Sequence, residues 1–166
     1  IQLKSNVKVI SRHSSYLSSG SIRYLHSGLF SARIADSDAV LKEGSNEWTC
    51  LPANPRGQSN PENGWVDAHE AMPLCGDAEV FKWIGAYFAG EVPVMDKDGY
   101  AWMLHGDMGE DNTMAGVMTE EESTEGQWIE SGPHLMRMPA DPATLDGMTT
   151  DFTSGAPYVM FGGTIY

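Results

Sequence analysis

The sequence from residue 77 to residue 90 reads DAEVFKWIGAYFAG, and it decides the fold class that we expect. Asp77 is a residue type that caps helix N-termini, Glu79 falls in the first turn, and Gly90 suits the position just past the last turn. The apolar side chains recur at helical spacing in one stripe: Val80, Phe81, Ile84 and Phe88, widened by Trp83 and Tyr87. This pattern predicts one amphipathic helix over Ala78–Ala89, and such a stripe is more typical of a core than of a cofactor site.

Short strand patterns lie on both sides of this helix. Before it, Asp38–Leu41 and Glu47–Leu51 flank a turn, and Trp65–Met72 fits one or two helical turns that end at Pro73. After it, four more segments are candidate strands: Tyr100–Leu104, Trp128–Ile129, His134–Met138 and Tyr158–Phe161. Residues 106–126 are acidic and contain glycine, which predicts a long loop. Strands around one principal helix indicate a loop-rich α+β fold with a mainly antiparallel sheet.

The charge is divided between two parts of the chain, whose net charge is −13. Residues 1–35 carry five basic residues and no acidic one, whereas residues 36–166 carry all 23 acidic residues and five basic ones. We therefore expect a basic, Ser-rich, extended arm (1–35) and an acidic globular domain (36–166). An acidic body repels the phosphates of nucleic acids, and no stretch is apolar for long enough to span a bilayer. The expected partners are copies of the same chain or subunits of a larger protein complex.

The beginning of the arm has the pattern of a strand. Residues 1–10 read IQLKSNVKVI, and the alternation places Ile1, Leu3, Val7 and Val9 on one face. Such a strand can pair with the edge of a sheet in a neighbouring subunit, and repetition of that contact builds a filament or a larger complex. A structural subunit is our leading hypothesis. Serine and arginine without acids are also typical of organelle targeting segments, so one alternative is an accessory subunit of an organellar complex with a retained targeting segment. A secreted protein that binds calcium or copper is the other alternative.

The two cysteines, Cys50 and Cys75, lie in Pro- and Gly-rich surroundings 25 positions apart. They are either two buried thiols or a disulfide. We favour the disulfide, because a long irregular loop gains most from a covalent link and an oxidising compartment permits one.

Several short motifs follow one another in the acidic part of the chain: Leu41–Leu51, Met72–Cys75, Gly99–Asp107, Asp111–Thr113, Ser131–Met136, Pro139–Leu145 and Gly155–Tyr166. Together they resemble a family of secreted bacterial proteins with no assigned activity, over residues 36–166 only. The resemblance implies an extracellular or periplasmic location and supports the disulfide. Family members have Gln in place of His105, which argues against a shared role for this histidine. They also continue beyond the position of Tyr166 by about one strand, so we expect an unpaired sheet edge.

Two groups of residues have the chemistry of metal ligands. Hard oxygen ligands at short spacing suit calcium, and the candidates are Asp107, Glu110, Asp111 and Asn112. Thioethers beside imidazoles suit copper, and the candidates are Met103, His105, His134 and Met136. The alternatives are a solvated acidic loop and methionines that fill an irregular core. No nucleophile elbow, phosphate loop or dinucleotide fingerprint is present in the sequence, so we expect no enzyme and no cofactor beyond these metals.

Overall fold

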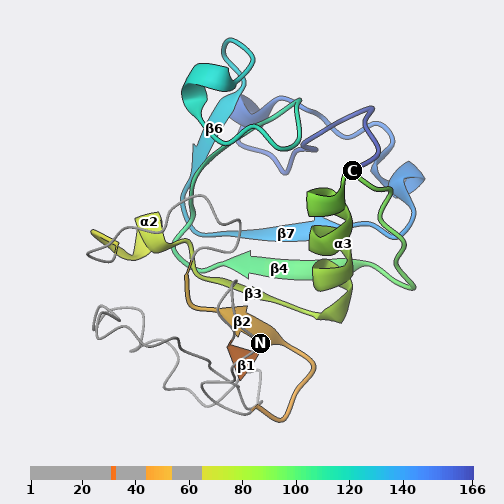
Figure 1. The fold of residues 1–166 in the computed structure, drawn as a ribbon. Helices are drawn as coiled ribbons and strands as arrows, with labels where there is room; N and C mark the ends of the chain where they lie inside the picture. Colours follow the sequence, from red (N-terminus) through yellow and green to blue (C-terminus); the bar gives the residue numbers. More distant parts are fainter. Residues whose placement is uncertain (1–30, 33–43, 54–64) are drawn as a thin grey trace.

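The centre of the molecule is a five-stranded sheet in the order β1-β2-β3-β4-β7 (Figure 1). The computed structural model describes residues 31–32, 44–53 and 65–166. The strands of the main sheet are β1 (Ser31–Ala32), β2 (Thr49–Leu51), β3 (Leu74–Gly76), β4 (Gly99–Met103) and β7 (His134–Met138). The pairing of β1 with β2 is parallel, and the other three pairings are antiparallel. A second, two-stranded antiparallel sheet joins β5 (Asp107–Asp111) to β6 (Trp128–Ser131).

The principal helix, α3 (Ala78–Ala89), has the bounds that the sequence predicts. The Asp77 carboxylate accepts a hydrogen bond from the backbone N–H of Val80, and Gly90 ends the helix in the left-handed conformation. The helix lies on one face of the sheet (Figure 1), and it buries Val80 completely. The core consists of Met72, Leu74, Val80, Ala101, Met103 and Met138. The expected α+β architecture with a mainly antiparallel sheet is confirmed for the described residues.

The second side of α3 packs against the end of the chain. The Trp83 and Tyr87 rings stack with centroids 5.3 Å apart, and Tyr166 approaches Tyr87 to 5.3 Å and Trp83 to 5.9 Å. Phe161 contacts Tyr87 from the same segment, at 6.1 Å. The wide apolar stripe of the helix therefore has two partners, the sheet and the C-terminal segment.

Two predicted elements are wrong. Part of the expected loop 106–126 is strand β5, because its backbone pairs with β6 despite a sequence of low strand propensity. Gly109 permits this pairing, since a Cβ atom there would lie 2.2 Å from the Trp128 ring. The expected strand Tyr158–Phe161 is absent. In this segment the backbone N–H of Val159 donates to the Thr149 carbonyl, and that of Phe161 donates to the Asn112 carbonyl. These are isolated hydrogen bonds to two different residues and not the ladder of a strand pair.

The remaining elements are short. Helix α2 (Ala68–Ala71) is one turn long and lies within Trp65–Met72, where one or two helical turns were expected. Three 3₁₀ helices follow later in the chain: η2 (Glu120–Glu122), η3 (Pro142–Leu145) and η4 (Phe152–Ser154). The sequence interpretation missed strand β3, which contains Cys75. The predicted strands 1–10 and 38–41 lie outside the described residues. No helix within the described ranges combines the length and the apolar character needed to cross a membrane.

Candidate functional site

Strand β7 forms one edge of the main sheet. It pairs with β4 over its full length, from Met103 opposite His134 to Gly99 opposite Met138. On its other side no strand of residues 31–32, 44–53 or 65–166 pairs with it. The opposite edge of the sheet is strand β1, which spans only two residues, so it presents a shorter row of backbone groups than β7 does. An edge strand presents a row of backbone N–H and C=O groups that can accept a further strand.

The face of the sheet opposite α3, which we name the outer face, carries a row of aligned side chains. The register places Cys50 opposite Cys75, Cys75 opposite Trp102, and Trp102 opposite Leu135. Because residues alternate between faces, Tyr100 shares the outer face with Trp102, whereas Ala101 and Met103 point to the core. Trp102 is 44% exposed and Leu135 is 50% exposed. The outer face therefore presents an apolar surface on an interior strand.

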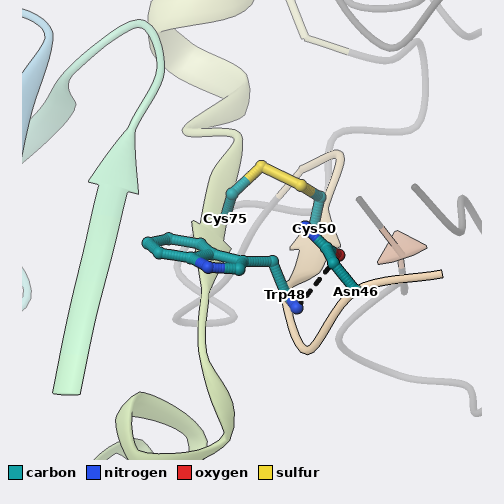
Figure 2. Close-up of a disulfide and its surroundings, with 4 residues drawn as sticks. All are labelled: Asn46, Trp48, Cys50 and Cys75. Atoms are coloured by element: carbon teal, nitrogen blue, oxygen red, sulfur yellow. Dashed lines mark hydrogen bonds between the residues drawn. A yellow bond between two sulfur atoms is a disulfide. The ribbon is translucent and has the colours of Figure 1, made fainter. Parts of the chain in front are cut away.

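The disulfide Cys50–Cys75 joins β2 to β3 within this row (Figure 2). The two cysteines face each other across the antiparallel pair with 4.0 Å between their Cα atoms, and both are buried. Just before β2, the backbone N–H of Trp48 donates to the side-chain oxygen of Asn46. The expected disulfide is present. It links two adjacent strands, whereas the sequence analysis expected it to close a long irregular loop.

A cluster of polar side chains lies where the two sheets meet. His69 of α2 donates from Nδ1 to the His105 carbonyl at 2.9 Å, and its Nε2 lies 2.9 Å from the Glu130 carboxylate. Both partners are acceptors, so both contacts form hydrogen bonds when the imidazole is protonated. The hydrogen bond to the His105 carbonyl raises the pKa of His69, and the Glu130 carboxylate adds to this effect.

A second histidine–carboxylate pair belongs to the same cluster. His134 bonds through Nδ1 to the Gly132 carbonyl, and its Nε2 lies 3.6 Å from Asp107. Gly106 brings the β4–β5 turn against the β6–β7 turn, since a Cβ atom there would lie 1.9 Å from the Ser131 carbonyl oxygen. Tyr158 lies beside this pair, and burial raises the pKa of its hydroxyl. A hydrogen bond with Ser131 lowers this pKa and the negative charge of Asp107 raises it, so that the net shift is upward. These contacts hold the two sheets together.

The four residues predicted to bind calcium lie on or just after β5, and each has protein partners of its own. Asp107 faces His134, Glu110 accepts from the Tyr87 hydroxyl, and Asn112 donates to Gln127 and to the Thr150 carbonyl. Burial raises the pKa of Asp111, but hydrogen bonds from Thr124, Thr113 and Met114 outweigh it and lower this pKa to about 2. The side-chain oxygen of Asn112 is buried, and no described residue forms a hydrogen bond with it.

Three of the four residues predicted to bind copper lie on the paired strands β4 and β7. Met103 and His134 are directly opposite across β4 and β7, and Met136 lies on the same face as His134, two residues further along β7. Met103 belongs to the core and Met136 packs against it. His105 lies beyond the end of β4, and its carbonyl accepts from His69. No group of three or more His, Cys, Asp or Glu side chains in the described part of the chain has a metal-binding arrangement.

Two features of this region were not recognised in the sequence. His69 and Glu130 meet although 61 positions separate them, and no local pattern indicates that contact. The outer-face row could have been found, because Tyr100 and Trp102 alternate with Gly99, Ala101 and Met103. That alternation predicts a strand with two apolar faces.

Comparisons with protein families, with curated proteins and with solved structures found no match. The resemblance to a family of secreted bacterial proteins therefore rests on the sequence motifs alone.

Proposed function

We propose that the protein is a structural subunit that assembles by strand addition. Residues 1–10 of one copy pair with the free edge of β7 in a neighbouring copy. The observation that carries this proposal is the position of β7 at the edge of the main sheet, where it pairs with β4 and with no other strand of the described residues. An added strand gains main-chain hydrogen bonds along the edge, and its alternate side chains meet the two faces of the sheet. Repetition from copy to copy builds a filament or a larger closed complex.

The other edge of the sheet supports β7 as the acceptor. Strand β1 forms that edge with only two residues, whereas β7 offers five residues to an incoming strand. The apolar side chains of residues 1–10 would extend one face of the acceptor sheet beyond β7. On the core side of β7 the neighbours are Met136 and Met138, and on the outer face they are Leu135 and Arg137.

Charge favours the encounter between arm and body. Within residues 44–53 and 65–166, the Lys and Arg side chains are Lys82, Lys97 and Arg137. Lys82 binds Glu79 and Asp96, and Arg137 binds Asp98 at 2.7 Å. Acidic residues far outnumber these three basic ones in the described part of the body, and a basic arm is attracted to such a surface.

The disulfide supports an extracellular or periplasmic location, because disulfides persist in oxidising compartments.

Deletion of residues 1–10 tests the proposal, with the size of the assembly measured by light scattering and its shape by electron microscopy. We expect the deletion variant to remain monomeric. A sharper variant exchanges neighbours in the arm, with Leu3→Lys, Lys4→Leu, Val7→Lys and Lys8→Val. This exchange keeps composition and net charge but destroys the alternation, and it should also prevent assembly.

The matched control removes charge and keeps the alternation. Lys4→Gln with Lys8→Gln should still assemble, more slowly and with a weaker dependence on salt. Assembly of the exchanged variant at the wild-type rate would show that electrostatic attraction alone joins the copies, and strand addition would be abandoned.

A further inference from the structure

The outer face of the sheet has an unusual exposure pattern for the middle of a sheet. Strand β4 lies between β3 and β7, yet its outer-face residues Tyr100 and Trp102 are 39% and 44% exposed. Leu135, directly opposite Trp102, is 50% exposed. At the other end of the same row, Cys50 and Cys75 are buried. The apolar surface is therefore concentrated on β4 and β7.

The chain that precedes β1 starts from the edge of this same sheet. Strand β1 pairs with β2, and β2 carries Cys50 in the outer-face row. Four strand spacings separate β1 from β7, which is about 19 Å. About six residues of extended chain cover that distance. Thirty residues precede β1, so the segment can cross the outer face and still continue beyond it.

The composition of this segment fits the outer face. Residues 16–30 read YLSSGSIRYLHSGLF, with seven apolar or aromatic side chains and no acidic one. Burying aromatic and leucine side chains against each other is the main source of stability for such a contact.

We propose that the outer face of the sheet, centred on Trp102 and Leu135, is the docking surface for residues 16–30 of the same chain. The segment crosses the sheet from β1 towards β7 and covers the exposed aromatic side chains. This contact is intramolecular and does not depend on the strand addition proposed above, because it uses a different part of the arm. It would direct residues 1–10 away from the domain at the β7 side, where a neighbouring copy can meet them.

The test is photo-crosslinking from the outer face in the full chain. The variant Trp102→p-benzoylphenylalanine places a photoreactive aromatic group at the centre of the proposed surface. After irradiation, we expect cross-links to residues 16–30 within a species of monomer mass, identified by peptide mass spectrometry. The matched control is Phe88→p-benzoylphenylalanine, since Phe88 is 50% exposed on α3, on the opposite side of the sheet. It should give no cross-link to residues 16–30.

Other occupants of the outer face would give different products. Cross-links from position 102 only to another copy, or no cross-link at all, would overturn the proposal, and so would equal cross-linking from positions 102 and 88. The deletion of residues 1–10 separates the two hypotheses. It should abolish assembly and leave the cross-link from position 102 unchanged. Loss of that cross-link in the deletion variant would also contradict intramolecular docking of residues 16–30.

Discussion

The buried carboxylate of Asp111 allows a prediction whose magnitude follows from the structure. Asp111 is fully buried at the end of β5, and it accepts hydrogen bonds from both ends of the loop that follows. Oδ1 accepts from the backbone N–H groups of Thr113 and Met114 and from the Thr113 hydroxyl, and Oδ2 accepts from the Thr124 N–H. The carboxylate therefore closes the loop between residues 113 and 124.

The pKa of Asp111 gives the expected size of its contribution to stability. A carboxyl whose pKa falls from 3.8 to about 2 on folding stabilises the native state by about 2.5 kcal/mol at neutral pH. Because the folded pKa is depressed, this contribution is present above pH 3.8 and is lost as the pH falls through 2. The variant Asp111→Asn removes the charge and points an amide donor at one of the backbone donors. We expect it to lower the free energy of unfolding by about 2–4 kcal/mol at pH 7.

Urea unfolding at several pH values between 7 and 2 checks this prediction. The difference between wild type and Asp111→Asn should shrink as the pH falls below 4. The matched control is Asp151→Asn, because Asp151 accepts from the N–H and hydroxyl of Thr153 in the same Asp-x-Thr motif but is exposed. Its urea midpoint should match that of the wild type. If both variants lose the same stability, or if the loss from Asp111→Asn does not change with pH, the buried carboxylate does not close the loop as described.

Three further predictions concern the contacts that hold the two sheets together and the disulfide that joins β2 to β3. The variant Gly106→Ala should cost about 1–3 kcal/mol more than Gly147→Ala in urea unfolding, because both glycines have φ near +80° but only Gly106 contacts backbone; equal losses would contradict the close approach of the two turns. Replacing both cysteines by alanine should lower the free energy of unfolding by about 3–4 kcal/mol, measured by denaturant titration, and an unchanged midpoint would show that the disulfide does not contribute. The pKa of His69 is raised above 6.5, so its contribution to stability is complete below pH 6.5 and is lost as the pH rises through the raised value; NMR titration should give a lower pKa for His69 in Glu130→Gln, and an unchanged pKa would exclude the ion pair.

Local sequence signals determined the principal helix and most strands of this protein. The helix Ala78–Ala89 has its cap, stripe and terminal glycine within 14 consecutive residues, so hydrogen bonds and periodicity within that stretch suffice to define it. The strand His134–Met138 was likewise predicted with its bounds, and the disulfide was correctly favoured. The prediction of a loop at residues 107–111 was wrong, because this acidic sequence forms strand β5 only when β6 pairs with it.

Only the tertiary structure decided which strands are neighbours and which side chains meet. The order of the main sheet places β4 beside β7 and leaves β7 at an edge, and no property of residues 134–138 alone determines that position. In the same way, His69 meets Glu130, and Trp102 aligns with Cys75 and Leu135, because long-range backbone pairing brings them together. Local free energies specify a helix or a strand pattern, whereas the burial of apolar surface between distant segments selects the pairing.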